Sequence, residues 1–203
     1  MTPERALYIY GAGGHAKVVA DAFGGPVAGF IDDNPERAGT RFLDRPVLCL
    51  GDVPADAGVH VAIGDSTVRA KLSAAAEARG LALTTICHPA AVIASDADIG
   101  SGSFVAARAV LAPASRIGSG TIVNHGAVVD HDSTTGPWCH IAPNATLGGG
   151  VYLGAHVLIG ANAAVLPGRR ICEGCQVGAA SAVIRDLEIP GTYAGSPARA
   201  TRK

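Results

Sequence analysis

Three histidines with two flanking aspartates are the residues of this chain whose types and spacing best suit acid–base or metal chemistry. His125, His131 and His140 fall within sixteen residues, and Asp130 and Asp132 stand on either side of the middle one. Neutral imidazoles bind transition metals, and an imidazole beside a carboxylate takes up a proton near neutral pH. A metal site, a proton-transfer site and a merely structural role are all open until the element that carries the histidines is known.

That element is a six-residue repeat in the second half of the chain. From Ile93 to Val183 every sixth residue is aliphatic apart from Thr135, and a small residue stands two positions before most of them. Glycine often follows the aliphatic residue, as at Gly100 and Gly118, where we expect it to adopt backbone conformations that other residues resist. This period predicts a left-handed parallel β-helix, in which three repeats complete one coil of a triangular prism, with about five coils in all.

The repeat also constrains the histidines. Residues six apart lie on adjacent faces of such a prism, so we expect His125 and His131 around a corner from each other and His140 on a further face. This spacing does not favour a cage of three histidines within one chain. A cage shared between subunits, as in the prism-shaped γ-carbonic anhydrases, stays open. Flat faces with few charges also predict self-association.

The first half of the chain predicts a small α/β domain of nucleotide-binding type with a short parallel sheet. A strand over 7–10, a glycine turn over 11–14 and a helix over 16–23 begin it. Further strands end near residues 33 and 65, and an alanine-rich helix over 68–80 is closed by Gly80. With about three strands, the unit is too short for a full dinucleotide-binding fold.

Glycines between a strand and a helix let backbone N–H groups approach a phosphate, so a nucleoside diphosphate ligand fits this unit better than a dinucleotide. A tight turn without a ligand is the alternative. Carboxylates at the end of the second strand are placed to accept hydrogen bonds from a sugar hydroxyl. The residues predicted to bind this ligand are Gly13, Gly14, His15, Asp32, Asp33 and Gly64.

Composition narrows the class of protein. The formal net charge of −1 offers no basic face for nucleic acid, and no apolar run approaches the ~18–20 residues of a membrane span. The start of the chain does not resemble a signal peptide, so we expect a cytoplasmic protein. The five cysteines lack a framework spacing, and Cys172 and Cys175 form one CxxC without a second pair. We therefore expect reduced thiols and no metal.

Taken in order, these motifs resemble the PglD/NeuD group of bacterial nucleotide-sugar acetyltransferases. The resemblance spans essentially the whole chain and rests on GAGGHAKVV (11–19), FIDDN (30–34), AIGDSTVR (62–69), the hexapeptide prism, VVDHDS (128–133) and GSPAR (195–199). It implies a nucleotide-sugar-binding domain over 1–88, a β-helix that binds acetyl-CoA over 89–186 and a tail over 187–203. It also implies a homotrimer with active sites between subunits.

The implied reaction moves an acetyl group from acetyl-CoA to the amine, at C4, of a UDP- or GDP-linked dideoxy amino sugar. An amine that attacks a thioester becomes positively charged and must lose a proton, and the resemblance makes His131 the general base. Asp132 or Asn124 would orient it; the family often has Glu where Asp132 stands, one methylene longer. The backbone N–H of Gly149 would bind the thioester oxygen. The implied acetyl-CoA contacts are His140, Gly149, Ala161 and Ala179. Arg169 and Arg170 are, by their charge, candidates for the CoA phosphates, with a solvated corner as the alternative.

Three alternatives remain at this point. An O-acetyltransferase acting on a sialic-acid-type sugar would share the scaffold and the donor. A zinc lyase of the γ-carbonic anhydrase type belongs to a different class, and so does a non-catalytic sensor of nucleotide sugars.

Overall fold

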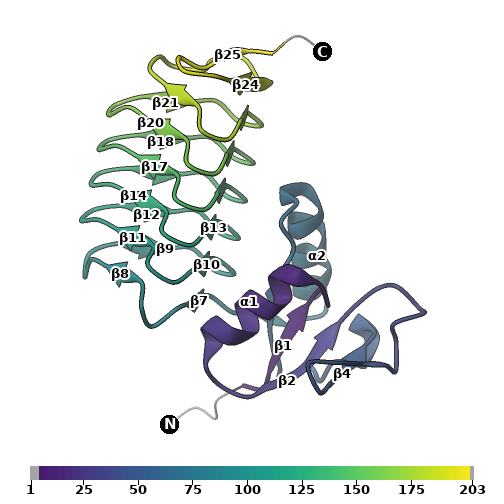
Figure 1. Cartoon of the computed structure of the whole chain (residues 1–203). Coiled ribbons are helices and arrows are strands. Elements are labelled where there is room, and N and C mark those ends of the chain that lie inside the picture. Colours follow the sequence, from purple (N-terminus) through teal and green to yellow (C-terminus); the bar gives the residue numbers. More distant parts are fainter. Residues whose placement is uncertain (1–4, 202–203) are drawn as a thin grey trace. The chain divides into compact units, whose positions relative to one another are not determined.

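The computed structural model describes residues 5–201, which form two compact units that divide between Ile86 and Cys87. The division lies two residues before the boundary expected from the sequence. The first unit is an α/β domain and the second is a β-helix closed by a short tail (Figure 1). The predicted order of a small parallel α/β unit followed by a parallel β-helix is confirmed.

The α/β unit is a sheet in strand order β3-β4-β2-β1-β5-β6, in which the β3–β4 pair is antiparallel and the other pairs are parallel. Its helices are α1 (Gly14–Phe23), α2 (Ser66–Ala78) and the short 3₁₀ helix η1 (Leu50–Asp52). Neither these nor any other helix among residues 5–201 is long and apolar enough to cross a membrane. The strands are β1 (Leu7–Tyr10), β2 (Val27–Ile31), β3 (Arg41–Phe42), β4 (Arg45–Leu48), β5 (Gly58–Val61) and β6 (Ala82–Leu83).

Local chemistry explains where the helices begin and end. The Asp65 side chain accepts the N–H of Val68 at 2.8 Å and caps α2, and α1 ends at Gly24 with a left-handed φ of 66°. Gly80, predicted to close the second helix, has φ 77° and donates its N–H to Glu77. These caps fix the points at which the chain leaves and re-enters the sheet.

The expected number of about three strands was too low. Beyond β1, β2 and β5, the described chain adds β3, β4 and β6 to the sheet. β4 contains Pro46 and two exposed residues, so it lacks the alternation of a half-buried strand. β3 and β6 have two residues each, too few for a periodic signal.

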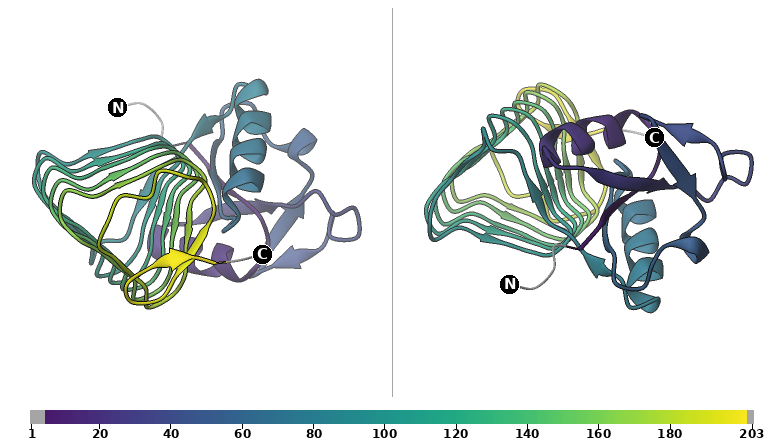
Figure 2. Two further views of the ribbon diagram at one scale, coloured as in Figure 1. Left: turned by 90° about the horizontal axis from the view of Figure 1, so that it is seen from above. Right: turned by 90° about the horizontal axis from the view of Figure 1, so that it is seen from below.

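The second unit is a parallel β-helix with a triangular outline (Figure 2). Face 1 consists of β7 (Ile86–Cys87), β10 (Phe104–Val105), β13 (Ile122–Val123), β16 (His140–Ile141), β19 (Leu158–Ile159) and β22 (Gln176–Val177), extended by β24 (Thr192–Ala194) and β25 (Arg199–Ala200). Face 2 consists of β8 (Val92–Ile93), β11 (Val110–Leu111), β14 (Val128–Val129), β17 (Thr146–Leu147), β20 (Ala164–Val165) and β23 (Ala182–Val183). Face 3 consists of β9 (Asp98–Ile99), β12 (Arg116–Ile117), β15 (Thr134–Thr135), β18 (Tyr152–Leu153) and β21 (Arg170–Ile171).

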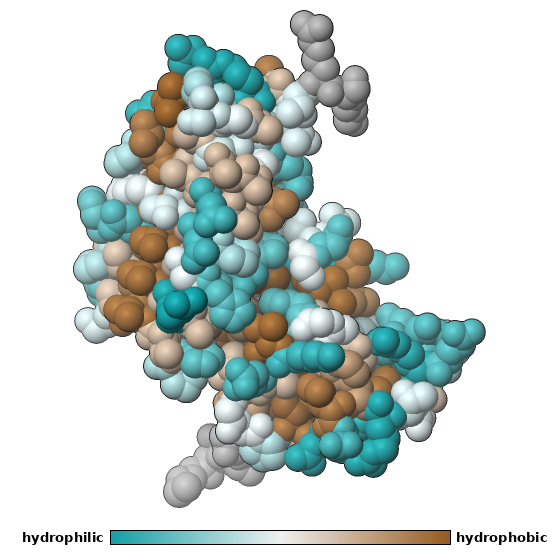
Figure 3. All heavy atoms as spheres, in the orientation of Figure 1, coloured by the Kyte–Doolittle hydropathy of each residue, from teal (hydrophilic) through white to brown (hydrophobic). Residues whose placement is uncertain are grey.

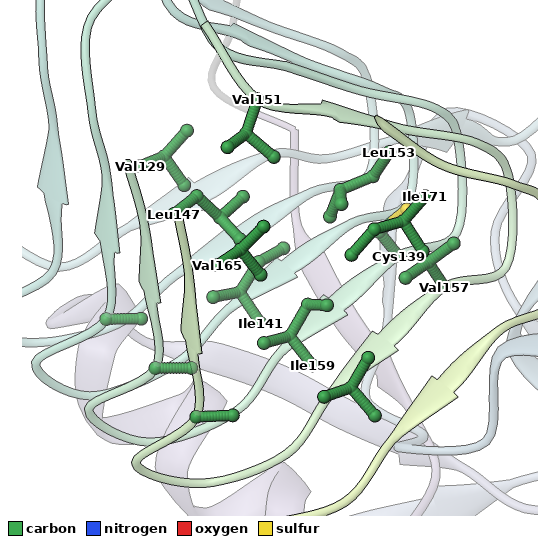
Figure 4. Close-up of a cluster of buried hydrophobic side chains, with 14 of the residues drawn as sticks. Val129, Cys139, Ile141, Leu147, Val151, Leu153, Val157, Ile159, Val165 and Ile171 are labelled. Atoms are coloured by element: carbon green, nitrogen blue, oxygen red, sulfur yellow. The ribbon is translucent and has the colours of Figure 1, made fainter. Parts of the chain in front are cut away.

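The register places residues eighteen apart directly above one another, as in Val123↔Ile141 on face 1 and Val129↔Leu147 on face 2. The aliphatic residues of the repeat point into the prism and form one core, as predicted (Figure 4). Thr135, the single break in the series, is also buried, and its Oγ1 accepts the N–H of Gly118 at 3.0 Å. In neighbouring coils the equivalent glycine N–H donates to a backbone carbonyl, so replacing that carbonyl by the threonine hydroxyl costs the ladder no hydrogen bond.

The reason given above for the glycines after the aliphatic residues was wrong. Gly100, Gly118, Gly136 and Gly154 do not have a positive φ; the left-handed residues of the corners lie elsewhere, for example at Gly168, with φ 70°. A Cβ on Gly136 would instead meet the backbone nitrogen of Ala155 in the next coil at 2.6 Å. These glycines are needed for space between coils and not for backbone freedom.

Two alanine substitutions distinguish the steric role of glycine from its conformational role. Gly136→Ala forces backbone apart, and we expect it to lower the free energy of unfolding by about 3 kcal/mol. Gly168→Ala, whose Cβ would meet nothing within 4 Å, carries only the cost of a left-handed alanine, about 1 kcal/mol. Urea unfolding followed by the fluorescence of Trp138, the single tryptophan, measures both. If both variants lost the same free energy of unfolding, or if Gly168→Ala lost more, the steric explanation would be contradicted.

Candidate functional site

His131 stands at the corner after β14, held by the aspartates on either side of it. Its backbone N–H donates to Asp130 Oδ1 at 2.8 Å, and its Nδ1 lies 2.8 Å from Asp132 Oδ2. Asp132 has a left-handed φ of 59°, which Asp tolerates better than most residues. Nδ1–H therefore donates to the carboxylate, and Nε2 keeps its lone pair on a side chain that is 61% exposed. The shorter Asp reaches the imidazole that the family's Glu would reach.

The charges around His131 make it a stronger base. The hydrogen bond to Asp132, and then the negative charge of Asp130, raise the pKa of the imidazole above its ordinary value. A raised pKa increases the affinity of Nε2 for a proton but leaves less of the neutral form at a given pH. The arrangement suits a group that takes a proton during a reaction and holds it as imidazolium.

Gly149 lies against the imidazole, one coil further along the chain. A Cβ there would come within 2.6 Å of His131 Cε1 and closer still to Nε2, so a larger residue would displace the ring from this position. Within residues 5–201 the Gly149 N–H makes no hydrogen bond, while its carbonyl accepts the N–H of Gly168 at 2.9 Å. Two other corner positions along this edge, Pro113 (eighteen residues before His131) and Pro167 (eighteen residues after Gly149), have no N–H, so the β-helix does not need this N–H. A basic nitrogen thus adjoins a backbone donor with no internal partner.

A buried hydroxyl fixes this corner. Ser133 Oγ donates to the carbonyl of Gly148 at 2.9 Å and accepts the N–H of Val151 at 3.1 Å. The bonds span the Gly148–Gly150 turn and connect it to the coil that carries His131. The position of Gly149 beside the imidazole therefore depends on packing between coils and not on the glycine turn alone.

The other two histidines are not arranged as expected. His140 is in β16 of face 1, paired with Ile122 of β13, the strand that His125 follows. The expectation that the three histidines separate onto three faces was therefore wrong for this pair. Asn124 Nδ2 lies 3.2 Å from His140 Nε2, and its Oδ1 accepts the N–H of His125 at 2.9 Å. Within one chain Asn124 thus contacts His140, whereas His131 is oriented by Asp132.

The remaining residues predicted to contact acetyl-CoA lie at a different corner. Ala161 and Ala179 follow strands of face 1 one coil apart, and the carbonyl of Ala161 accepts the N–H of Ala180. Gly149 follows a strand of face 2. One chain therefore does not bring its Gly149 and His131 together with its Ala161 and Ala179.

The two arginines proposed for the phosphates have partners within the chain. Arg169 Nη1 lies 3.5 Å from Asp186 Oδ1, and the Arg170 guanidinium lies over the ring of Tyr152, 4.2 Å from its centroid. Their positions near the end of the β-helix are compatible with a surface role. The geometry does not single out either for CoA.

No metal centre is formed by the described side chains. Among residues 5–201, no three or more His, Cys, Asp and Glu side chains are grouped so that they could hold an ion. The CxxC thiols lie 3.4 Å apart, and burial raises the pKa of Cys175 to about 12, so it is a neutral thiol near pH 7. Cys175 belongs to the core of the β-helix.

The α/β unit contains a cavity of about 480 Å³ where β1, β2 and β5 end. Of the residues predicted to bind a nucleotide, Gly13, Asp32 and Asp33 line it, whereas Gly14, His15 and Gly64 do not. Gly14 begins α1, and the carbonyl of Gly64 accepts a hydrogen bond from Arg69. The complete lining is Tyr10, Gly11, Ala12, Gly13, Ile31, Asp32, Asp33, Arg37, Ile63, Val68, Lys71 and Leu72.

Sequence reasoning missed Tyr10, Arg37 and Lys71. Arg37 Nη1 donates to the carbonyl of Ala12 at 2.6 Å and to Asp32 Oδ2 at 3.0 Å, which ties the turn after β2 to the glycine turn. Lys71 has no ion pair among residues 5–201. It is the lining cation whose charge no described side chain balances. Its position seven residues after Gly64, on the helix that follows β5, was the available signal.

Comparison with known proteins shows the family of this chain. Residues 6–76 match the family model of the PglD N-terminal domain. A GDP-perosamine N-acetyltransferase from Caulobacter crescentus, solved with CoA and GDP-perosamine and with one histidine replaced by alanine, is 36% identical; the match covers 98% of this chain and 97% of that one, with a TM-score of 0.90. The acetyltransferase domain of PglB from Neisseria gonorrhoeae FA1090 is 32% identical over 98% of this chain and 100% of that one, again with a TM-score of 0.90. This chain belongs to the PglD-like family of nucleotide-sugar acetyltransferases.

The two aspartates beside His131 should be separable by titration. We expect Asp132→Asn to lower the pKa of His131 more than Asp130→Asn does, because the hydrogen bond to Asp132 is the larger cause of the raised value. Imidazole chemical shifts followed by NMR across pH measure both. Because a base must be unprotonated to act, any rate that depends on His131 would then retain activity to lower pH in Asp132→Asn. An unchanged pKa in that variant would contradict the assigned contact.

Proposed function

We propose that this protein transfers the acetyl group of acetyl-CoA to the C4 amine of a nucleotide-linked dideoxy amino sugar, with His131 as general base. The observation that supports this best is the His131–Asp132 pair beside the N–H of Gly149, which has no partner among residues 5–201, in a chain similar over almost its whole length to a GDP-perosamine N-acetyltransferase. That likeness favours N-acetylation over the O-acetyltransferase alternative.

The chemistry follows from the groups at the corner. Nε2 of His131 accepts the proton that the amine loses as it attacks the thioester carbon, and Asp132 stabilises the imidazolium. The N–H of Gly149 donates to the oxygen that becomes negatively charged in the tetrahedral intermediate. As the intermediate collapses, the carbon–sulfur bond breaks, the amide forms and the thiolate of CoA leaves. The proton held by His131 is then available to the thiolate or to solvent.

The sugar nucleotide is assigned to the cavity of the α/β unit. Gly13 and Gly14 leave backbone N–H groups exposed at the start of α1, and a Cβ on either would meet nothing within 4 Å. Their lack of side chains is thus not required by the fold, but it lets a diphosphate approach. Lys71 supplies an unbalanced positive charge to the same cavity. Gly14, His15 and Gly64 do not line the cavity and remain predictions at its border.

The active enzyme is proposed to be a homotrimer with each site between two subunits. His131 and Gly149 stand at the corner after face 2. His140 lies on face 1, and Ala161 and Ala179 lie at the corner after face 1. Because these are different corners of one chain, the proposal brings the two sets together around one thioester from two neighbouring chains. Face 2 also exposes apolar residues such as Val92, which is 63% exposed, and Figure 3 shows hydrophobic surface interrupting the polar surface of the β-helix.

Loss of the base should abolish turnover without unfolding the protein. We expect His131→Ala to reduce acceptor-dependent release of CoA thiol by about a hundredfold or more, because proton transfer to a positioned base contributes at least that much. Thiol release is measured with GDP- and UDP-linked 4-amino sugars as acceptors. His125→Ala, one repeat earlier, is the matched control and should retain near-normal turnover. Near-normal turnover in His131→Ala would contradict the role of His131.

Mixing two variants, each with one altered histidine, tests whether the site is shared. Homotrimers of His131→Ala or of His140→Ala have a defect in every site. Co-expressed chains form mixed trimers in which the intact His131 of one chain meets the intact His140 of another, so thiol release should rise well above that of either variant. No recovery, in particles shown by light scattering to be mixed trimers, would place both histidines in one subunit's site.

A further inference from the structure

The two aspartates after β2 look equivalent in the sequence but make different contacts. Asp32 has both oxygens engaged: Oδ1 accepts the N–H of Asn34 at 3.0 Å and Oδ2 pairs with Arg37 at 3.0 Å. It builds the turn and holds the arginine. Asp33 is exposed and, among residues 5–201, has no ion pair with a cation. Within the described part of the chain its two oxygens share one donor, the hydroxyl of Tyr10, at 2.7 and 2.8 Å.

Tyr10 is placed to hold this carboxylate. It is the last residue of β1, is 2% exposed and pairs with Ile31, so its hydroxyl reaches the residue two positions beyond the end of β2. Burial first, and then the hydrogen bond to Asp33, raise its pKa above the ordinary value, so the phenol stays a donor throughout the working pH range. Because an ionised carboxylate has about four lone-pair sites, both oxygens of Asp33 keep acceptor capacity toward the cavity.

The order of the strands indicates which part of the ligand meets Asp33. Along the sheet, β2 leads to Asp33, β1 leads to the glycine turn, and β5 leads to α2, which contains Lys71. The phosphates belong at the glycine turn and on the side of Lys71, so the nucleoside lies over the end of β2. The two fixed oxygens of Asp33 can accept hydrogen bonds from two adjacent donors. A ribose offers these as its 2′- and 3′-hydroxyls, and guanine offers them as N1–H and the 2-amino group, whereas uracil presents one N–H between two carbonyls.

We propose that Asp33 is the bidentate acceptor for the nucleoside of the sugar nucleotide, and that Tyr10 is the positioning residue that fixes its two oxygens. The inference rests on the proposed function and specifies how that substrate is recognised. The shared chemistry is a pair of adjacent neutral donors, supplied by the ribose or by a guanine base.

Calorimetric titration of the full-length protein with four nucleotides tests the proposal and separates the two sources. GDP is compared with 2′-deoxy-GDP, which lacks a ribose hydroxyl, with IDP, which lacks the 2-amino group, and with UDP. Asp33→Asn should weaken GDP binding about tenfold or more. Asp33→Asn also removes the Coulomb repulsion between a carboxylate and the diphosphate, which by itself would strengthen binding. A loss of affinity therefore reports the lost hydrogen bonds.

Tyr10→Phe should weaken GDP binding less than Asp33→Asn does and should reduce the discrimination between GDP and one analogue. Loss of discrimination against 2′-deoxy-GDP assigns the contact to the ribose, and loss against IDP assigns it to guanine; either supports the proposal. Tyr8→Phe, on the same strand but outside the cavity, is the matched control and should leave all four affinities unchanged.

Three results would overturn the proposal. They are GDP binding to Asp33→Asn at wild-type strength or better, wild-type discrimination in Tyr10→Phe, and no binding of any of the four nucleotides to the wild-type protein. Thiol release from acetyl-CoA is measured separately. An active enzyme whose nucleotide affinity is indifferent to Asp33 would refute this inference and leave the proposed function standing.

Discussion

The eighteen-residue register of the β-helix is the constraint on which the site depends. Every residue lies above the one eighteen positions earlier, so a substitution at one corner alters the packing of the next coil. The same spacing that stacks Val129 on Leu147 in the core sets Gly149 against His131 at the surface. A base and a backbone donor are thus brought together by hydrogen bonding between coils and by core packing, without a dedicated loop.

Most of the β-helix could be predicted because its signal is redundant. The inward series identifies strands of only two residues each, and the repeat tolerates one exception at Thr135, whose hydroxyl replaces a carbonyl in the ladder. What the period could not reveal was the reason for its glycines. Composition alone does not distinguish a left-handed backbone from a close approach between coils, and at Gly136 the approach is what matters.

The α/β unit and the site were harder to predict because their decisive contacts are not periodic. β4 carries a proline and exposed residues, so nothing in its composition marks a strand beside β2. Asp32 and Asp33 are identical in type, and only the partners Arg37 and Tyr10 distinguish them. The motif located His131, but that Asp132 and not Asn124 contacts its ring is a matter of side-chain direction at a corner.

The prolines on either side of the proposed reactive corner limit where such a site can be built. A base at any corner needs a donor one coil further on, which must have an N–H and no side chain in the way. Above Gly149 stands Pro167, which has no N–H, and below it His131 carries a side chain and gives its N–H to Asp130. Along this edge of the prism the proposed chemistry is therefore tied to a single coil, and a single substitution cannot move it by one coil.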